Sequence, residues 1–232
     1  MSEQLLVPSI EQRLAGMLEL TRRMKDGTGE GTQEKAKPTI TISREFGCEA
    51  FPMAERLKEL LEAKTRESWA VMDKELLEEA AKRHDLSMEI FASLGKKNRF
   101  MDEIIATFSS RWKSQKDYFQ LLGGQILSIA ATGNVIIIGR GSSVIAQELK
   151  NCFHFRMYAS HEFKVKSIAR RAKISPGEAD ALIDRRQKER DKFVRDFLDC
   201  DARDLRYYHL VFNNDKNPAD RIAKMIVSYV FP

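Results

Sequence analysis

The segment from residue 39 to residue 54, TITISREFGCEAFPMA, contains the residue types best suited to hold a phosphate group. A β-branched run stops at Ser43, a turn with Gly47 and Cys48 follows, and a helical pattern begins near Met53. In a strand, loop and helix arranged in this way, backbone N–H groups and the helix N-terminus surround an anion. We therefore predict a phosphate-binding loop formed by Ser43, Arg44, Gly47, Cys48 and Met53.

The same loop carries features that weaken an anion site. Gly47 is its one glycine, Glu49 adds a carboxylate that would repel phosphate, and no Lys-Ser or Lys-Thr pair follows. Cys48 beside a helix N-terminus would have a lowered pKa, or it is a small residue that fills a tight turn. Likewise, Arg44 either contacts phosphate or forms a surface ion pair with Glu45.

Three further polar clusters come directly after expected strands, at residues 73–74, 139–142 and 213–214. Because ligands of parallel sheets bind at the carboxyl ends of the strands, these clusters are expected to meet the loop at one edge. Arg140 lies between two glycines, and its guanidinium suits a bidentate contact with phosphate. Asp73 either orients an acceptor phosphate through magnesium or water, or caps the helix that follows it.

Arginines are dense in the second half of the chain. Arg186 and Arg190 are four residues apart and share one helix face, while Arg170 and Arg171 lie at the end of the preceding helical segment. Arginines that converge on a transferring phosphoryl group would stabilise its charge. The alternative is an exposed helix whose arginines pair with neighbouring acids, namely Asp184, Glu189 and Asp191.

Alternating strands and helices must position these residues. Apolar and β-branched runs predict strands over 39–42, 70–72, 134–139, 153–159 and 209–213. Helical patterns are expected over 53–61, 74–83, 87–131, 162–198 with a break at 175–177, and 218–229. This alternation indicates an α/β fold, a five-stranded parallel sheet flanked by helices, with right-handed crossovers.

The composition indicates a globular protein with a sizeable core, at 43% hydrophobic and 31% charged residues. No apolar run approaches the roughly 18–20 residues of a membrane span, so we expect a cytoplasmic protein with no membrane partner. The net charge is +5, and residues 156–206 hold 14 Lys and Arg against 10 Asp and Glu. This excess suits phosphate-bearing ligands, whereas the interspersed acids argue against nucleic acid as a partner. Three scattered cysteines give neither a metal-ligand spacing nor a disulfide framework.

Residues 1–37 are expected to form an appendage, and residues 38–232 the main domain. An amphipathic helix is predicted over 9–24, with Ser9 as its N-cap, and a glycine-rich linker over 26–32. This N-terminal helix is expected to pack on its own domain or to form a homodimer with a second copy.

Four motifs, in their order along the chain, resemble the cytidylate kinase-like family of P-loop nucleoside monophosphate kinases. They are Ile42-Ser43-Arg44-Glu45-Phe46-Gly47, Asp73-Lys74-Glu75-Leu76-Leu77, Ile138-Gly139-Arg140-Gly141-Ser142 and Leu210-Val211-Phe212-Asn213. The basic, aromatic lid of the family is resembled by Arg190, Phe193, Arg195 and Phe197. The resemblance covers about residues 38–230, most of the chain.

The resemblance implies a P-loop kinase core, a helical insert over 84–130 that closes on the acceptor nucleotide, and a lid over 170–200 that closes on the phosphates. It implies transfer of the γ-phosphoryl group of ATP to a pyrimidine monophosphate, with Mg²⁺ as the cofactor. The implied catalytic residues are Arg140, Arg186 and Arg190, and the implied acceptor-binding residues are Asp73, Lys74, Gly139, Gly141 and Ser142. The lid arginines would be Arg170, Arg171 and Arg195, and no residue is expected to hold a resident metal.

The chain departs from the family pattern in the loop and in the lid. The family follows Gly47 with a small residue, two glycines and a basic residue, where this chain has Cys48, Glu49, Ala50 and Phe51. Gln187 replaces an acid of the lid. Two alternatives to an active kinase therefore stay open: a kinase fold that binds a nucleotide or a protein without turnover, and a dimeric scaffold.

Overall fold

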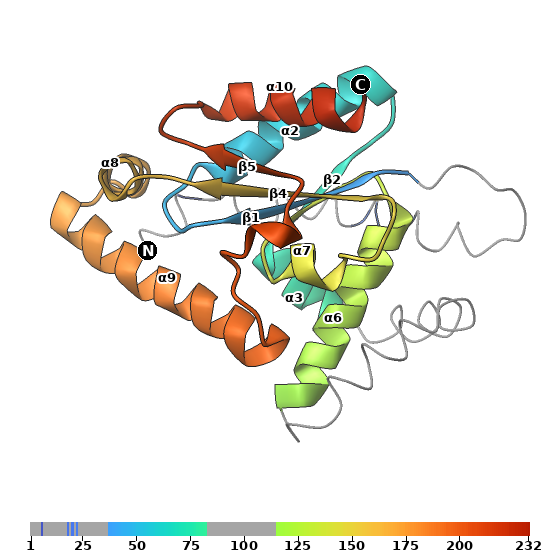
Figure 1. Ribbon diagram of the computed structural model, residues 1–232, viewed down its shortest axis with the longest axis horizontal. Coiled ribbons are helices and arrows are strands. Elements are labelled where there is room, and N and C mark those ends of the chain that lie inside the picture. Colours follow the sequence, from blue (N-terminus) through green and yellow to red (C-terminus); the bar gives the residue numbers. More distant parts are fainter. Residues whose placement is uncertain (1–5, 7–17, 19, 21, 23–36, 83–114) are drawn as a thin grey trace, which may run out of the picture.

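The computed structural model describes residues 6, 18, 20, 22, 37–82 and 115–232. Its centre is a sheet of five strands, β1 (Thr39–Arg44), β2 (Ala70–Met72), β3 (Val135–Ile138), β4 (Cys152–Tyr158) and β5 (Leu210–Asn213). The strand order is β2-β3-β1-β4-β5, and every pairing is parallel (Figure 1). The expected α/β fold with a parallel sheet is confirmed.

Helices cover both faces of this sheet (Figure 1). On one face lie α2 (Ala50–Thr65) and α10 (Ala219–Val230), and on the other lie α3 (Lys74–Lys82), α6 (Gln115–Thr132) and α7 (Ser142–Ile145). Two further helices, α8 (His161–Ala172) and α9 (Pro176–Leu198), pack on each other beyond the carboxyl ends of the strands. A short 3₁₀ turn, η3 (Leu205–Tyr207), precedes β5.

The central strands are buried on both faces, which explains their continuous apolar sequences. Ile40 and Ile42 of β1 belong to the core cluster under α2 and α10. Val135 and Ile137 of β3 belong to the cluster under α3, α6 and α7. Alternate residues of each strand therefore pack against helices on opposite faces of the sheet. Both faces are apolar, so both must be covered by helices.

Strand β1 is longer than its β-branched run predicted. Ser43 and Arg44 continue the ladder by pairing with Arg156 and Met157 of β4, so they are strand residues rather than loop residues. Helix α2 begins earlier than expected, which makes Pro52 its third residue. Proline is tolerated there because the first N–H groups of a helix have no partner within the helix.

The predicted break in the long basic region separates α8 from α9. Ser175 caps α9 with a capping box to Glu178, and Pro176 occupies the first helical position. Apolar residues of both helices enclose Phe46 of the loop in a third core cluster, formed by Phe46, Ile168, Ala172, Ala179, Leu182 and Ile183. Because this cluster includes a loop residue, the helix pair is packed directly on the loop between β1 and α2.

Two predicted segments are only partly described. Residues 115–130 of the predicted insert form most of α6, which packs into the core through Phe119, Leu122 and Ile126, and the rest of the insert lies outside the described residues. In the N-terminal segment, Leu20 lies in the same core cluster and Leu6 packs beside the third cluster. A homodimer through this segment stays a prediction. No helix in the described part of the chain has the length and hydropathy of a membrane span.

Candidate functional site

The loop between β1 and α2 is folded tightly, and its N–H groups are largely taken up by protein acceptors. Gly47 has φ of +102°, and a Cβ placed on it would lie 2.6 Å from Cβ of Lys164. The N–H of Phe46 donates to Oε1 of Gln187 at 2.8 Å, and the N–H of Glu49 donates to Oδ1 of Asn214 at 2.8 Å. Side-chain carbonyl oxygens therefore accept two of the loop N–H groups that the sequence predicted to bind an anion.

Both carboxylates of the loop are paired with basic residues of α8. Glu45 forms an ion pair with Lys164 at 2.9 Å, and Glu49 forms one with Arg170 at 2.6 Å. Glu45 thus pairs with Lys164, and not with Arg44 as one of the alternatives predicted. The Glu49 carboxylate, which was expected to repel phosphate, is neutralised by Arg170.

Arg44 and Arg140 meet over the turn that ends β3. Gly139, Arg140 and Gly141 all have positive φ values, of 80°, 54° and 70°. A Cβ on Gly139 would clash with Nη1 of Arg44, so the glycine makes room for that guanidinium. The Arg140 side chain lies 4.3 Å above the ring of Phe193 and forms an ion pair with Glu78. Two guanidinium groups from neighbouring strand ends are thereby placed together.

Arg190 of α9 completes a buried group of cations. Burial lowers the pKa of Arg44 and of Arg140 to about 10 each. Burial, with repulsion from Arg44, Arg186 and Arg140, lowers the pKa of Arg190 well below its usual range. Two guanidinium nitrogens, Nε of Arg140 and Nη1 of Arg190, are buried with no hydrogen-bond partner within the described residues. Such groups are costly to bury without an acceptor, so the arrangement is suited to an anion.

Arg156 adds a fourth cation at this edge, and sequence reasoning missed it. Nη1 of Arg156 donates to Oγ of Ser43 at 3.0 Å, and the hydroxyl of Tyr208 lies 3.0 Å from the same oxygen and 2.6 Å from the carbonyl oxygen of Ala202. The Tyr208 hydroxyl is placed to donate to both oxygens and has one hydrogen, which these two acceptors therefore share. The signal in the sequence was a charge inside the buried strand FHFRMY.

Asp73 caps a helix and also lies close to the cations. Its Oδ1 accepts the N–H of Leu76, as expected of an N-cap, and its charge raises the pKa of Arg44 against the larger lowering by burial. Lys74 is near enough to Arg140 and Arg186 for their charges to lower its pKa, although burial is the larger cause. Ser142 is buried, and its N–H donates to the carbonyl oxygen of Gly139. Among the described residues, no group of three His, Cys, Asp or Glu side chains is placed to hold a metal ion.

Other predicted site residues lie apart from this group. Burial raises the pKa of the Cys48 thiol to about 12, which fits a residue that fills a turn. Met53 is a correction: it lies in the core and its N–H donates to the carbonyl oxygen of Glu49, so it offers nothing to an anion. Arg171 donates to the carbonyl oxygen of Leu6, and Arg195 is exposed on α9.

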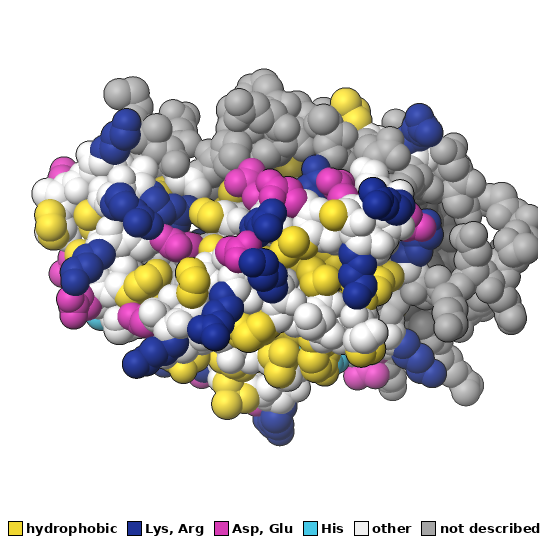
Figure 2. Space-filling model, turned by 90° about the horizontal axis from the view of Figure 1, so that it is seen from above, with side chains coloured by type: hydrophobic (Ala, Val, Ile, Leu, Met, Phe, Trp, Pro, Cys, Tyr) yellow, Lys and Arg dark blue, Asp and Glu magenta, His cyan; other side chains and the backbone are white. Residues whose placement is uncertain are grey.

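Among the described residues, Lys and Arg side chains form no basic stripe on the face covered by α2 and α10 (Figure 2). Figure 2 shows Lys and Arg side chains there interspersed with Asp and Glu, as in the network of Arg56 with Glu59 and Asp220. A duplex-binding surface gathers one sign of charge, whereas the described part of this face mixes both signs (Figure 2).

Comparison with solved structures supports the fold. A crystal structure of an uncharacterized protein from Eubacterium ventriosum ATCC 27560 aligns with a TM-score of 0.67 and 22% identity, covering 84% of this chain and 98% of the other. Dephospho-CoA kinase from Campylobacter jejuni aligns at 11% identity over 84% of this chain and 98% of its own, with a TM-score of only 0.34. This second alignment is too weak to establish a common fold.

Comparison with curated proteins gave no match. The model of the cytidylate kinase-like family, by contrast, matches residues 39–216. This range contains the loop between β1 and α2, the Gly-Arg-Gly turn after β3, and helices α8 and α9. The match extends over most of the chain and includes all five strands of the sheet. The chain therefore belongs to the cytidylate kinase-like family.

Proposed function

We propose that this protein is a nucleotide phosphotransferase that moves the γ-phosphoryl group of ATP to a pyrimidine nucleoside monophosphate. The observation that carries the proposal is the group of Arg44, Arg140 and Arg190, which are packed together at the carboxyl edge of the sheet. Nε of Arg140 and Nη1 of Arg190 are buried without an acceptor among the described residues, and phosphate oxygens are acceptors that arginine binds strongly.

The positions of the residues suggest a division of roles. Arg140 and Lys74, beside Asp73, would bind the acceptor phosphate at the ends of β2 and β3. The segment from Ser43 to Cys48 would face the donor phosphates at the end of β1. Arg186 and Arg190 would approach from α9 and neutralise the charge of the transferring group. Phosphoryl transfer depends mainly on such positioning and charge stabilisation, so it needs no covalent nucleophile.

Magnesium fits this site as an ion carried largely by the phosphates. Kinase sites commonly hold Mg²⁺ through one or two carboxylates together with substrate oxygens and water. Asp73 is the carboxylate that would hold it here, because it is buried beside Arg44 at the strand end. When bound, the ion would neutralise charge on the phosphate oxygens.

A second candidate function is nucleotide binding without turnover. It is favoured by the loop, in which Gln187 and Asn214 already accept the N–H groups of Phe46 and Glu49. The loop also has Phe51 where the family has a basic residue, and Phe51 packs against the core. A ligand would have to displace these contacts, and the loop would add little positive charge of its own.

One pair of measurements separates the two candidates. Thermal unfolding is followed with millimolar Mg-ATP and, separately, with CMP, dCMP, UMP and AMP, because a ligand at 100 times its Kd adds about 2.7 kcal/mol of stability. ADP formation is then measured with Mg-ATP and each monophosphate. ADP release with one pyrimidine monophosphate is the expected result. Shifts in Tm without ADP release would favour binding alone, and no shift with any nucleotide would refute both functions.

A further inference from the structure

The phosphate-binding loop of this chain has no basic side chain between Glu45 and Phe51. Its two charged residues in that range, Glu45 and Glu49, are both acids. A triphosphate bound there would meet no cation supplied by the loop, although the charge of the β- and γ-phosphates needs one. The positive charge must therefore come from another element.

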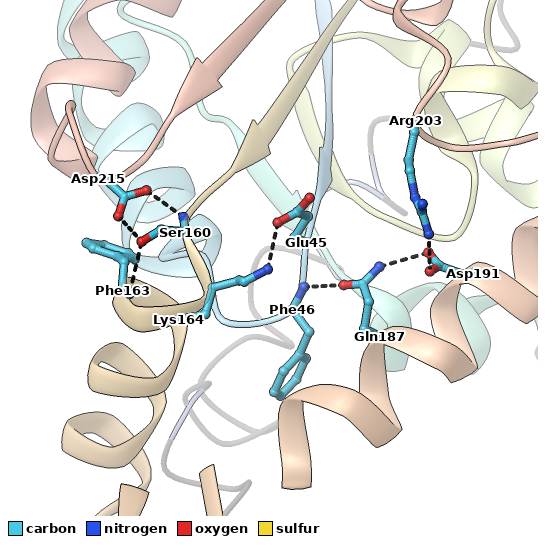
Figure 3. Close-up of polar contacts among 9 residues, drawn as sticks. All are labelled: Glu45, Phe46, Ser160, Phe163, Lys164, Gln187, Asp191, Arg203 and Asp215. Carbon is cyan, nitrogen blue, oxygen red and sulfur yellow. Dashed lines mark hydrogen bonds and ion pairs between the residues drawn. The ribbon is translucent and has the colours of Figure 1, made fainter. Parts of the chain in front are cut away.

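Lys164, in the first turn of α8, lies directly against this loop. Its Cβ, Cγ and Cα are the atoms that a Cβ on Gly47 would meet, at 2.6, 2.9 and 3.1 Å. Its side chain is only 14% exposed, whereas that of Lys166, two residues further along the helix, is 75% exposed. Figure 3 shows Lys164 extending from α8 toward the loop, between Ser160 and Phe46. The lysine is thus held against the loop and kept from solvent.

The ammonium group of Lys164 is only partly satisfied there. Nζ donates to Oε2 of Glu45 at 2.9 Å, and within the described residues this is its one hydrogen-bond acceptor. An ammonium group has three hydrogens to donate. Its charge also reaches Cys48, in the middle of the loop, where it acts to lower the thiol pKa against the larger effect of burial. The Lys164 ammonium group therefore lies close to the loop and has hydrogens left to donate to a ligand.

We propose that Lys164 supplies the donor phosphates with the positive charge that the phosphate-binding loop lacks, and that Glu45 is its counter-ion in the nucleotide-free protein. This proposal rests on the proposed function, because it concerns the same site. The donor phosphates would take over the ammonium hydrogens, and Glu45 would compete with them for Lys164. The loop and α8 would then form one composite phosphate site.

The test measures Mg-ATP affinity by isothermal titration calorimetry in Lys164→Met and in Lys166→Met. Both variants remove one positive charge from the first turns of α8, but only Lys164 faces the loop. We expect Lys164→Met to weaken Mg-ATP binding by about 10- to 100-fold, as for the loss of a hydrogen bond to a charged group. Lys166→Met is expected to bind like the wild type. Thermal unfolding of each variant checks the fold, and Lys164→Gln replaces Lys164→Met if that variant does not fold.

A second comparison uses the counter-ion. Glu45→Gln releases Lys164 and is expected to strengthen Mg-ATP binding in the wild-type background, but not in the Lys164→Met background. This dependence distinguishes a direct contact from a structural role of the lysine. Mg-ATP binding that is equal in Lys164→Met and Lys166→Met would overturn the inference alone. A wild-type protein that does not bind Mg-ATP would overturn the proposed function and this inference together.

Discussion

Arg190 provides the sharpest test of the candidate site, because its substitution should change stability and binding in opposite directions. The change is Arg190→Met, which removes the charge and keeps most of the length of the side chain. Arg190 is buried among Arg44, Arg140 and Arg186, and its Nη1 atom has no acceptor in the described part of the chain. In the nucleotide-free protein this buried charge therefore lowers the free energy of unfolding.

The expected size follows from the contacts of Arg190. A buried donor without a partner costs about 1–3 kcal/mol, and more for a charged group. The guanidinium lies 4.8 Å above the ring of Phe46, a contact worth up to about 2 kcal/mol. In the Arg190→Met variant, contact of the sulfur with the Phe46 ring would restore about 0.3–1.5 kcal/mol of the lost cation–π energy. The net gain in unfolding free energy is then about 1–2 kcal/mol, or roughly 2–8 °C in Tm for a chain of this size.

The assay combines thermal unfolding without nucleotide and titration with Mg-ATP and with the acceptor that shifts Tm. We expect a higher Tm and a loss of nucleotide affinity of about 10- to 100-fold, since a hydrogen bond to a charged group is worth about 1.5–3 kcal/mol. Lys188→Met, an exposed position on the same helix, serves as the control and should change neither quantity. A variant with a lower Tm and unchanged nucleotide binding would show that Arg190 is structural and refute the reasoning.

Three further predictions concern the elements around the site. In urea unfolding, Gly47→Ala should destabilise the protein by more than about 2 kcal/mol, because φ is +102° and Lys164 fills the space that a Cβ would need. Gly123→Ala, within α6, is the control: a Cβ there would meet nothing within 4 Å, so the variant should be more stable by about 0.5–1 kcal/mol. Ser43→Ala should cost about 1–3 kcal/mol by leaving Arg156 and Tyr208 without their shared partner. Tyr208→Phe should also destabilise the protein, because it removes the hydroxyl that contacts Ser43 and the Ala202 carbonyl oxygen; two variants as stable as the wild type would discard this network. Burial lowers the pKa of His154 from 6.5 to about 4. Above pH 6.5 His154 is neutral in both the folded and the unfolded state, and its contribution to stability is fully present. As the pH falls from 6.5 to 4 only the unfolded state takes up the proton, so this contribution is lost. The loss is about 3 kcal/mol, and His154→Gln, but not the exposed His161→Gln, should remove it from the pH dependence of unfolding.

Local sequence patterns predicted the sheet, and they assigned the candidate site to one edge of it. Runs such as VIII at 135–138 are fully apolar because both faces of a parallel strand are covered, and this pattern depends on local residues alone. The polar clusters after each strand could be assigned to one edge because parallel strands end on the same side. Arg44, Arg140 and Asp73 were identified in this way, and Arg190 through its helix spacing and the family resemblance.

The tertiary structure decided which partners the charges have. From the sequence, Glu49 looks like a defect of an anion site and Glu45 like a possible partner of Arg44. Instead α8 lies across the loop and pairs Glu45 with Lys164 and Glu49 with Arg170, more than 100 residues away in the chain. The extension of β1 to Arg44 depended on β4, since only the partner strand supplies the ladder.

Lys164 and Tyr208 carried little local signal, because a charged or aromatic residue is common on helices and turns. Their positions around the loop come from the packing of α8 and from the segment before β5. Local pattern thus fixes which elements form and where their ends meet, because periodicity and turn chemistry act over a few residues. The protonation, pairing and exposure of the site depend on long-range packing, which only the folded chain sets.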